Sequence, residues 1–65
     1  SDLKEIKKKM HDASGAIQIL ETFVKHVDSS SFNNDLKALH SAAERSIARL
    51  RESFEGAQRL LGQMS

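Results

Sequence analysis

Apolar residues recur at helical spacing along the whole chain. In the first half they fall at alternating steps of three and four, an unbroken heptad pattern made of Leu3, Ile6, Met10, Ala13, Ile17, Leu20, Val24 and Val27. The second half continues with Phe32, Leu36, Leu39, Ala43, Ile47, Leu50, Phe54, Ala57, Leu61 and Met64, with one extra step of four after Ala43. No stretch alternates with a period of two, so the sequence predicts two helices and no strand.

The two helical patterns meet at Asp28-Ser29-Ser30-Ser31, residue types that favour turns and helix N-caps. We therefore predict a first helix over about 3–27, a turn over about 28–31 and a second helix over about 32–64, with Ser30 or Ser31 capping the second helix. The chain has no proline and three glycines, so long helices can run with little interruption. The predicted fold is an all-α antiparallel hairpin, with residues 1–65 as a single domain.

The apolar stripe is wider than the contact between two helices requires. Further apolar residues flank the heptad pattern: Ala16, Ile19 and Phe23 in the first helix, and Ala42 and Leu60 in the second. A chain of 65 residues gains little net stability from the burial available within one hairpin. The surplus indicates a partner surface, and a second copy is the simplest partner, giving a homodimeric four-helix bundle with two-fold symmetry.

Composition excludes several classes of function. Ten Lys and Arg against nine Asp and Glu leave a net charge of +1, and three Phe are the only Phe, Trp or Tyr residues, so we expect no nucleic-acid partner. No apolar run approaches about 18 residues, so we expect no membrane contact by this segment. The absence of Cys fits a cytoplasmic location, alone or within a membrane-anchored parent. His11, His26 and His40 lack the spacing of metal ligands, so no metal site is expected.

His11 is the candidate functional residue. It falls at heptad position b, which points away from the apolar pattern. The small residues Ala13, Ser14, Gly15 and Ala16 follow it closely. Because a glycine inside a helix costs about 1 kcal/mol relative to alanine, Gly15 calls for an explanation. We infer that the small residues clear the surface so that another protein can approach the imidazole. The same face carries the residues that we predict to dock a partner: Lys7, Lys8, Ser14, Gly15 and Gln18.

Asp12, the next residue, offers a carboxylate to the His11 ring. It can accept the Nδ1 proton, orient the ring and raise the basicity of Nε2. A neutral imidazole held in this way is a good nucleophile for a phosphoryl group. A histidine beside an aspartate is also common on helix surfaces without any chemistry, and the neighbouring lysines are often only a solvated face.

The stretch KKMHDASGAIQILETF, residues 8–23, resembles the H-box of the dimerisation and histidine-phosphotransfer domain of two-component sensor kinases. LKALHSAAERSIARLRESF, residues 36–54, resembles the second helix of that family. The resemblance implies a homodimeric four-helix bundle with His11 as phosphoacceptor and Asp12 as its acid/base neighbour. It implies two further partners, the receiver domain of a response regulator and an ATPase domain. The chain has no Gly-rich nucleotide-binding box and binds no cofactor itself, so ATP and Mg²⁺ are implied only through a separate or missing ATPase domain.

Two positions depart from the family pattern. Gly15 stands where the commonest H-boxes have Thr or Asn, and Ala16 stands where they often have Pro. The resemblance therefore leaves phosphatase activity open, and also whether the parent is a full kinase or a relay phosphotransferase. His40 lacks the Lys-Gly that follows the histidine of monomeric phosphotransfer bundles, and His26 lies near a helix C-terminus, where it suits the helix dipole.

Two other classes of function stay open from the residues. The first is a structural hairpin, a dimerisation or adaptor segment in which His11 does no chemistry. The second is an amphipathic helix that binds a surface through Lys4, Lys7, Lys8 and Lys9, although the absence of Trp and the small net charge weigh against it.

Overall fold

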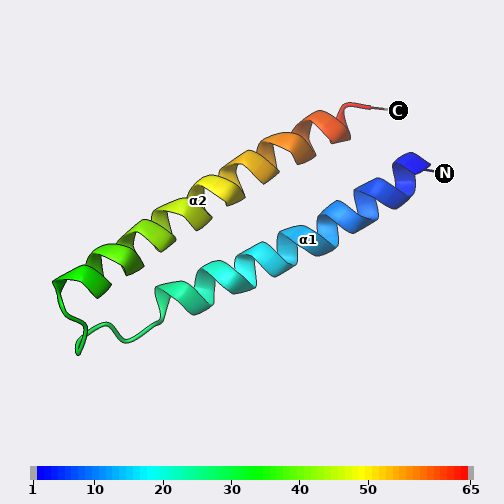
Figure 1. The fold of residues 1–65 in the computed structure, drawn as a ribbon. Helices are drawn as coiled ribbons and strands as arrows, with labels where there is room; N and C mark the ends of the chain where they lie inside the picture. The colour runs from blue at the N-terminus through cyan, green and yellow to red at the C-terminus, as the bar shows by residue number, and fades with distance from the viewer. Residues whose placement is uncertain (1, 65) are drawn as a thin grey trace.

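The computed structural model describes residues 2–64, which form two helices, α1 (Asp2–Lys25) and α2 (Asn34–Gly62). The helices run antiparallel and side by side, and the loop that joins them lies at the opposite end from the two chain termini (Figure 1). The hairpin is a rod with extents of 50 × 15 × 12 Å. The prediction of an all-α antiparallel hairpin is therefore confirmed.

The loop is longer than the sequence pattern predicts. α1 ends at Lys25 rather than near residue 27, and α2 begins at Asn34 rather than near residue 32. Val27 and Phe32 keep the apolar period but lie in the loop, where the Val27 backbone N–H donates to the Val24 carbonyl at 3.3 Å. Helical spacing alone does not set a helix end, because hydrogen bonds at the terminus decide where the helix stops.

The cap of α2 differs from the prediction. Neither Ser30 nor Ser31 caps this helix; instead the Asn33 side chain accepts a hydrogen bond from the Leu36 backbone N–H at 2.9 Å. Asn is as good an N-cap as Ser, and here it is the residue next to the helix. The Ser30 backbone N–H donates to Asp28 Oδ1 at 3.0 Å, and this bond holds the pKa of Asp28 below its ordinary value. The serines thus belong to a turn and not to the helix start.

α1 turns only one row of its apolar pattern toward α2. The residues at heptad position a are half-buried: Leu3, Met10, Ile17 and Val24. Three of the residues at position d are exposed, with 48% of Ile6, 47% of Leu20 and 43% of Val27 accessible to solvent. No side chain among residues 2–64 is fully buried. A single hairpin therefore has a contact between its helices but no enclosed core.

α2 mixes polar and apolar residues in the same contact. Half-buried apolar residues alternate there with half-buried polar ones, and the set includes His40, Glu44, Ile47, Arg51, Phe54, Gln58 and Leu61. In contrast, 67% of Leu39 and 49% of Leu50 are exposed. The pattern predicted both helices correctly, but it did not predict that polar side chains take part of the contact between them while leucines stay outside.

The exposed leucines of both helices lie on one side of the hairpin. Glu21 and Arg51 form an ion pair that joins the helices, with 3.0 Å between Arg51 Nε and Glu21 Oε1. Leu20 precedes Glu21 and Leu50 precedes Arg51, so both leucines lie at the same level along the rod. A step back of one residue turns a helix by about 100°, and in an antiparallel pair this step leads to the same side on both helices. We call this side, which carries Ile6, Leu20, Val27, Leu39 and Leu50, the apolar face.

Candidate functional site

His11 lies on the side of the hairpin opposite the apolar face. It follows Met10, a half-buried residue of the helix contact, so a step forward along α1 turns it away from Leu20 and its neighbours. Its side chain is exposed. It borders an open hollow of about 270 Å³ between the helices, here called the His11 hollow. The lining residues come from both helices and are Lys7, Met10, His11, Gln58, Leu61 and Gly62.

Asp12 is also exposed, but it does not hold the His11 ring in this conformation. Among residues 2–64, the side chains of His11 and Asp12 form no hydrogen bond or ion pair, so the predicted bond from His11 Nδ1 to the Asp12 carboxylate is not made. The reason is geometric, since side chains at consecutive helix positions diverge by about 100°. The orienting role of Asp12 stays a prediction, and it requires a change of side-chain rotamer.

The predicted docking residues fall into separate places on α1. Lys7 lines the His11 hollow, and its Nζ donates to the Met64 carbonyl oxygen at 3.3 Å. Gly15 and Gln18 border a second, shallower hollow of about 450 Å³ on the outside of α1. Ser14 is half-buried toward α2, and Lys8 is exposed.

The surface beside Gly15 is open, as its sequence context predicts. A Cβ atom built on Gly15 would meet no other atom within 4 Å, so packing against this chain does not require a glycine here. The second hollow continues to Ile19 and Phe23, whose exposed fractions are 59% and 70%. These two residues flank the apolar pattern in the sequence, and the structure leaves both uncovered.

Sequence reasoning missed the contribution of α2 to this site. Gln58, Leu61 and Gly62 line the His11 hollow, and Gln58 Nε2 donates to the Met10 carbonyl oxygen at 3.4 Å. One signal was available. Gln58 is polar and yet lies one turn after Phe54 and nearly one turn before Leu61, within the face that contacts α1. Which α1 residue it meets depends on the pairing of the helices, which the sequence does not state.

The other two histidines are engaged at the loop end of the rod. The ring of His40 lies with Nε2 at 2.7 Å from the Val24 carbonyl oxygen and Nδ1 at 3.4 Å from Glu44 Oε1. It also forms a T-shaped pair with the ring of Phe32, with ring centroids 6.2 Å apart. His26 Nδ1 lies 2.8 Å from the carbonyl oxygen of Thr22, four residues earlier. Of the three histidines, only His11 makes no hydrogen bond within residues 2–64.

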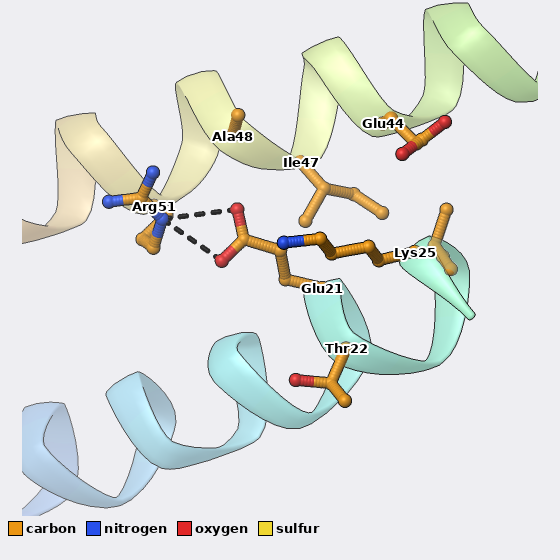
Figure 2. Close-up of a pocket in the computed structure, with 8 residues that line it drawn as sticks. Glu21, Thr22, Lys25, Glu44, Ile47, Ala48 and Arg51 are labelled. Carbon is orange, nitrogen blue, oxygen red and sulfur yellow. Dashed lines mark hydrogen bonds and ion pairs between the residues drawn. The ribbon is translucent and has the colours of Figure 1, made fainter.

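A second polar cluster lies between His11 and the loop. Figure 2 shows Arg51 of α2 bonded to Glu21 of α1, and Arg51 Nη1 also lies 3.3 Å from Glu55 Oε1. The hydrogen bond to Glu21, and to a smaller extent the one to Glu55, holds the pKa of Arg51 above its ordinary value. The cluster borders an open groove of about 410 Å³. The lining of this groove carries two acidic residues, Glu21 and Glu44, and two basic ones, Lys25 and Arg51. The Glu21–Arg51 pair joins the two helices.

Residues 2–64 offer neither a metal-binding cluster nor a helix able to span a membrane. No group of three or more His, Cys, Asp or Glu side chains there lies close enough together to hold a metal ion. Neither described helix is both long and apolar enough to cross a membrane. The candidate site consists of His11, Asp12 and the His11 hollow.

Comparison with known proteins gives no relative for this chain. No family model, no curated protein and no solved structure matches it.

Proposed function

We propose that this chain is a dimerising histidine-phosphotransfer module of two-component signalling. His11 accepts a phosphoryl group from a separate ATPase domain or from a phosphorylated regulator and passes it to a receiver-domain aspartate. The observation that carries the proposal is the position of His11. Its side chain is exposed, makes no hydrogen bond within residues 2–64 and lies opposite the face that a partner would cover.

The apolar face supports the dimeric part of the proposal. About half of the surface of both Leu20 and Leu50 is exposed, at the same level along the rod. Contact of this face with its counterpart on a second copy removes these residues from water and forms a four-helix bundle. Because His11 lies on the other side, such a dimer keeps both imidazoles accessible.

The proposed reaction is a displacement at phosphorus. A neutral His11 nitrogen attacks the phosphorus of an aspartyl phosphate, a P–N bond forms, the P–O bond to the carboxylate breaks, and the imidazole proton passes to solvent or to Asp12. The reverse reaction returns the phosphoryl group to a receiver aspartate. Covalent catalysis of this kind divides one difficult transfer into two easier ones.

A transfer assay tests the proposed function. The chain is incubated with a panel of receiver domains carrying ³²P on their phosphoacceptor aspartate, and its label is followed in acid and in base. We expect label that is lost in acid and kept in base, as a P–N bond requires. A chain that stays unlabelled with every receiver contradicts the proposal and favours a structural hairpin, which needs only the apolar face.

Asp12→Asn is expected to slow transfer by about a hundredfold, the usual scale for losing an acid/base partner. The fold should be unchanged, because the Asp12 side chain is exposed and makes no hydrogen bond within residues 2–64. Single-turnover transfer rates measure the effect, with circular dichroism as the check on helicity. Binding of the receiver should change little. A variant that transfers at the parental rate would show that the carboxylate is a bystander.

Gly15→Leu is expected to block transfer without damage to the helix. The added side chain enters open space, since a Cβ at this position meets no atom within 4 Å, and leucine has a higher helix propensity than glycine by roughly 0.8 kcal/mol. The leucine instead obstructs an approaching receiver. Gly15→Ala is the matched control, because it gives the same gain in propensity with only a methyl group. Equal transfer by the leucine variant and the parent would place docking elsewhere.

A further inference from the structure

The His11 hollow has the composition of a phosphoryl-binding site. Its lining includes the ammonium group of Lys7 and the side-chain amide of Gln58, and no carboxylate. Lys7 lies one turn before His11 on α1, so their side chains are neighbours on the helix surface. Gln58 is held beside His11 by its bond to the carbonyl oxygen of Met10, the preceding residue.

The present partners of both groups can be exchanged. The Lys7 ammonium donates to the Met64 carbonyl oxygen at 3.3 Å, and the Gln58 amide donates to Met10 at 3.4 Å. Both distances are long for hydrogen bonds, and both acceptors are neutral. Bonds to a charged acceptor are shorter and roughly twice as strong, so a phosphoryl dianion at His11 competes well for both donors.

The other lysines nearby are less suited to this role. Lys9 pairs with Glu5, with 3.7 Å between Nζ and Oε1. Lys8 is exposed and is not among the residues that line the hollow. Of these three lysines, only Lys7 lines the hollow, and its ammonium group is bonded to a neutral carbonyl.

We propose that Lys7 and Gln58 bind the phosphoryl group carried by His11, with Lys7 neutralising its charge and Gln58 donating a hydrogen bond from the second helix. This inference rests on the proposed function. It assigns to α2 a direct part in the site and gives Lys7 a role besides partner docking. Both contact the transferred group, while His11 forms the bond to phosphorus.

The test uses the full chain and phosphoramidate, a small phosphoryl donor that requires no protein partner. His11 attacks phosphorus, and the P–N bond of the donor breaks. The protonated nitrogen of the donor leaves as ammonia, and the imidazole proton goes to water. Phosphohistidine at each position is followed over time by mass spectrometry of peptides kept at alkaline pH. His26, which is also exposed, serves as an internal reference for uncatalysed reaction.

Lys7→Gln is expected to slow phosphorylation of His11 by about fivefold at low salt, the scale of one charge interaction at about 4 Å in water. Added salt should slow the parent and hardly affect this variant, because screening removes the same interaction. Lys7→Arg should restore most of the rate. Gln58→Leu should shorten the lifetime of phosphohistidine at His11. Lys37→Gln, the control, removes an exposed charge of α2 outside the site and should change the rate by less than about twofold.

The outcomes separate this inference from the proposed function. Equal rates and salt dependence in the parent, Lys7→Gln and Lys37→Gln overturn the inference and leave His11 as phosphoacceptor. Equal loss in the two glutamine variants also overturns it, because the effect would then come from general surface charge. If the parent reacts no faster at His11 than at His26, both the inference and the reactivity assigned to His11 are wrong.

Discussion

His11→Ala is expected to abolish phosphoryl acceptance completely. The reaction needs a nitrogen lone pair at an accessible position, and alanine supplies none. The variant should keep the helical content and the association state of the parent, because His11 is exposed and lies away from the apolar face. Label from ³²P-phosphorylated receiver domains measures the effect, and circular dichroism checks the fold.

The two other histidines provide matched controls. His26→Ala and His40→Ala should both retain label, since His26 lies within hydrogen-bonding distance of Thr22 and His40 of Val24 at the loop end. His40→Ala should also loosen that end of the rod, because it removes a contact between α2 and α1. Label that persists in His11→Ala, or that disappears only in one of the controls, would move the phosphoacceptor to another residue.

Leu20→Lys is expected to dissociate the proposed dimer and to lower its stability strongly. In one hairpin Leu20 is 47% exposed, so a lysine there costs little within the monomer. In a four-helix bundle the same position is covered, and an unpaired buried charge costs on the order of 3–5 kcal/mol. Leu50→Glu should act in the same way, because Leu50 lies at the same level on the same face.

Sedimentation equilibrium and thermal unfolding over a range of concentrations measure this effect. The parent should be dimeric at micromolar concentration, and its midpoint of unfolding should rise with concentration. Gln18→Lys is the control, since it places the same charge on an exposed residue outside the apolar face. A parent that is a well-folded monomer, or a Leu20→Lys variant that associates like the control, would contradict the bundle.

The sequence predicts the helices well because their cause is local. Apolar residues at steps of three and four, without proline, give α1 and α2 to within a few residues at each end. It does not predict which row of each pattern meets the other helix. That choice depends on the Glu21–Arg51 pair and on Gln58, which are bonded between the helices at 3.0 Å and 3.4 Å. The spacing of apolar residues does not reveal which polar side chains take part in the contact between the helices.

In the candidate site too, features that depend on one helix can be predicted from the sequence, and features that depend on the pairing of the helices cannot. The exposure of His11 and the open surface at Gly15 follow from positions on one helix, so the sequence is sufficient to predict them. The His11 hollow needs residues 58–62 brought beside residues 7–11, which is a matter of helix pairing. The bond between His11 and Asp12 depends on side-chain rotamers, and the described conformation does not form it.

The most direct test of the account is to identify the atom that carries the phosphoryl group. The chain is labelled from a phosphorylated receiver domain, digested at alkaline pH and sequenced by electron-transfer fragmentation, with the association state measured on the same sample. We expect a P–N bond on His11, none on His26 or His40, and a dimer. A phosphoryl group on another residue, or no labelled peptide at all, would contradict it.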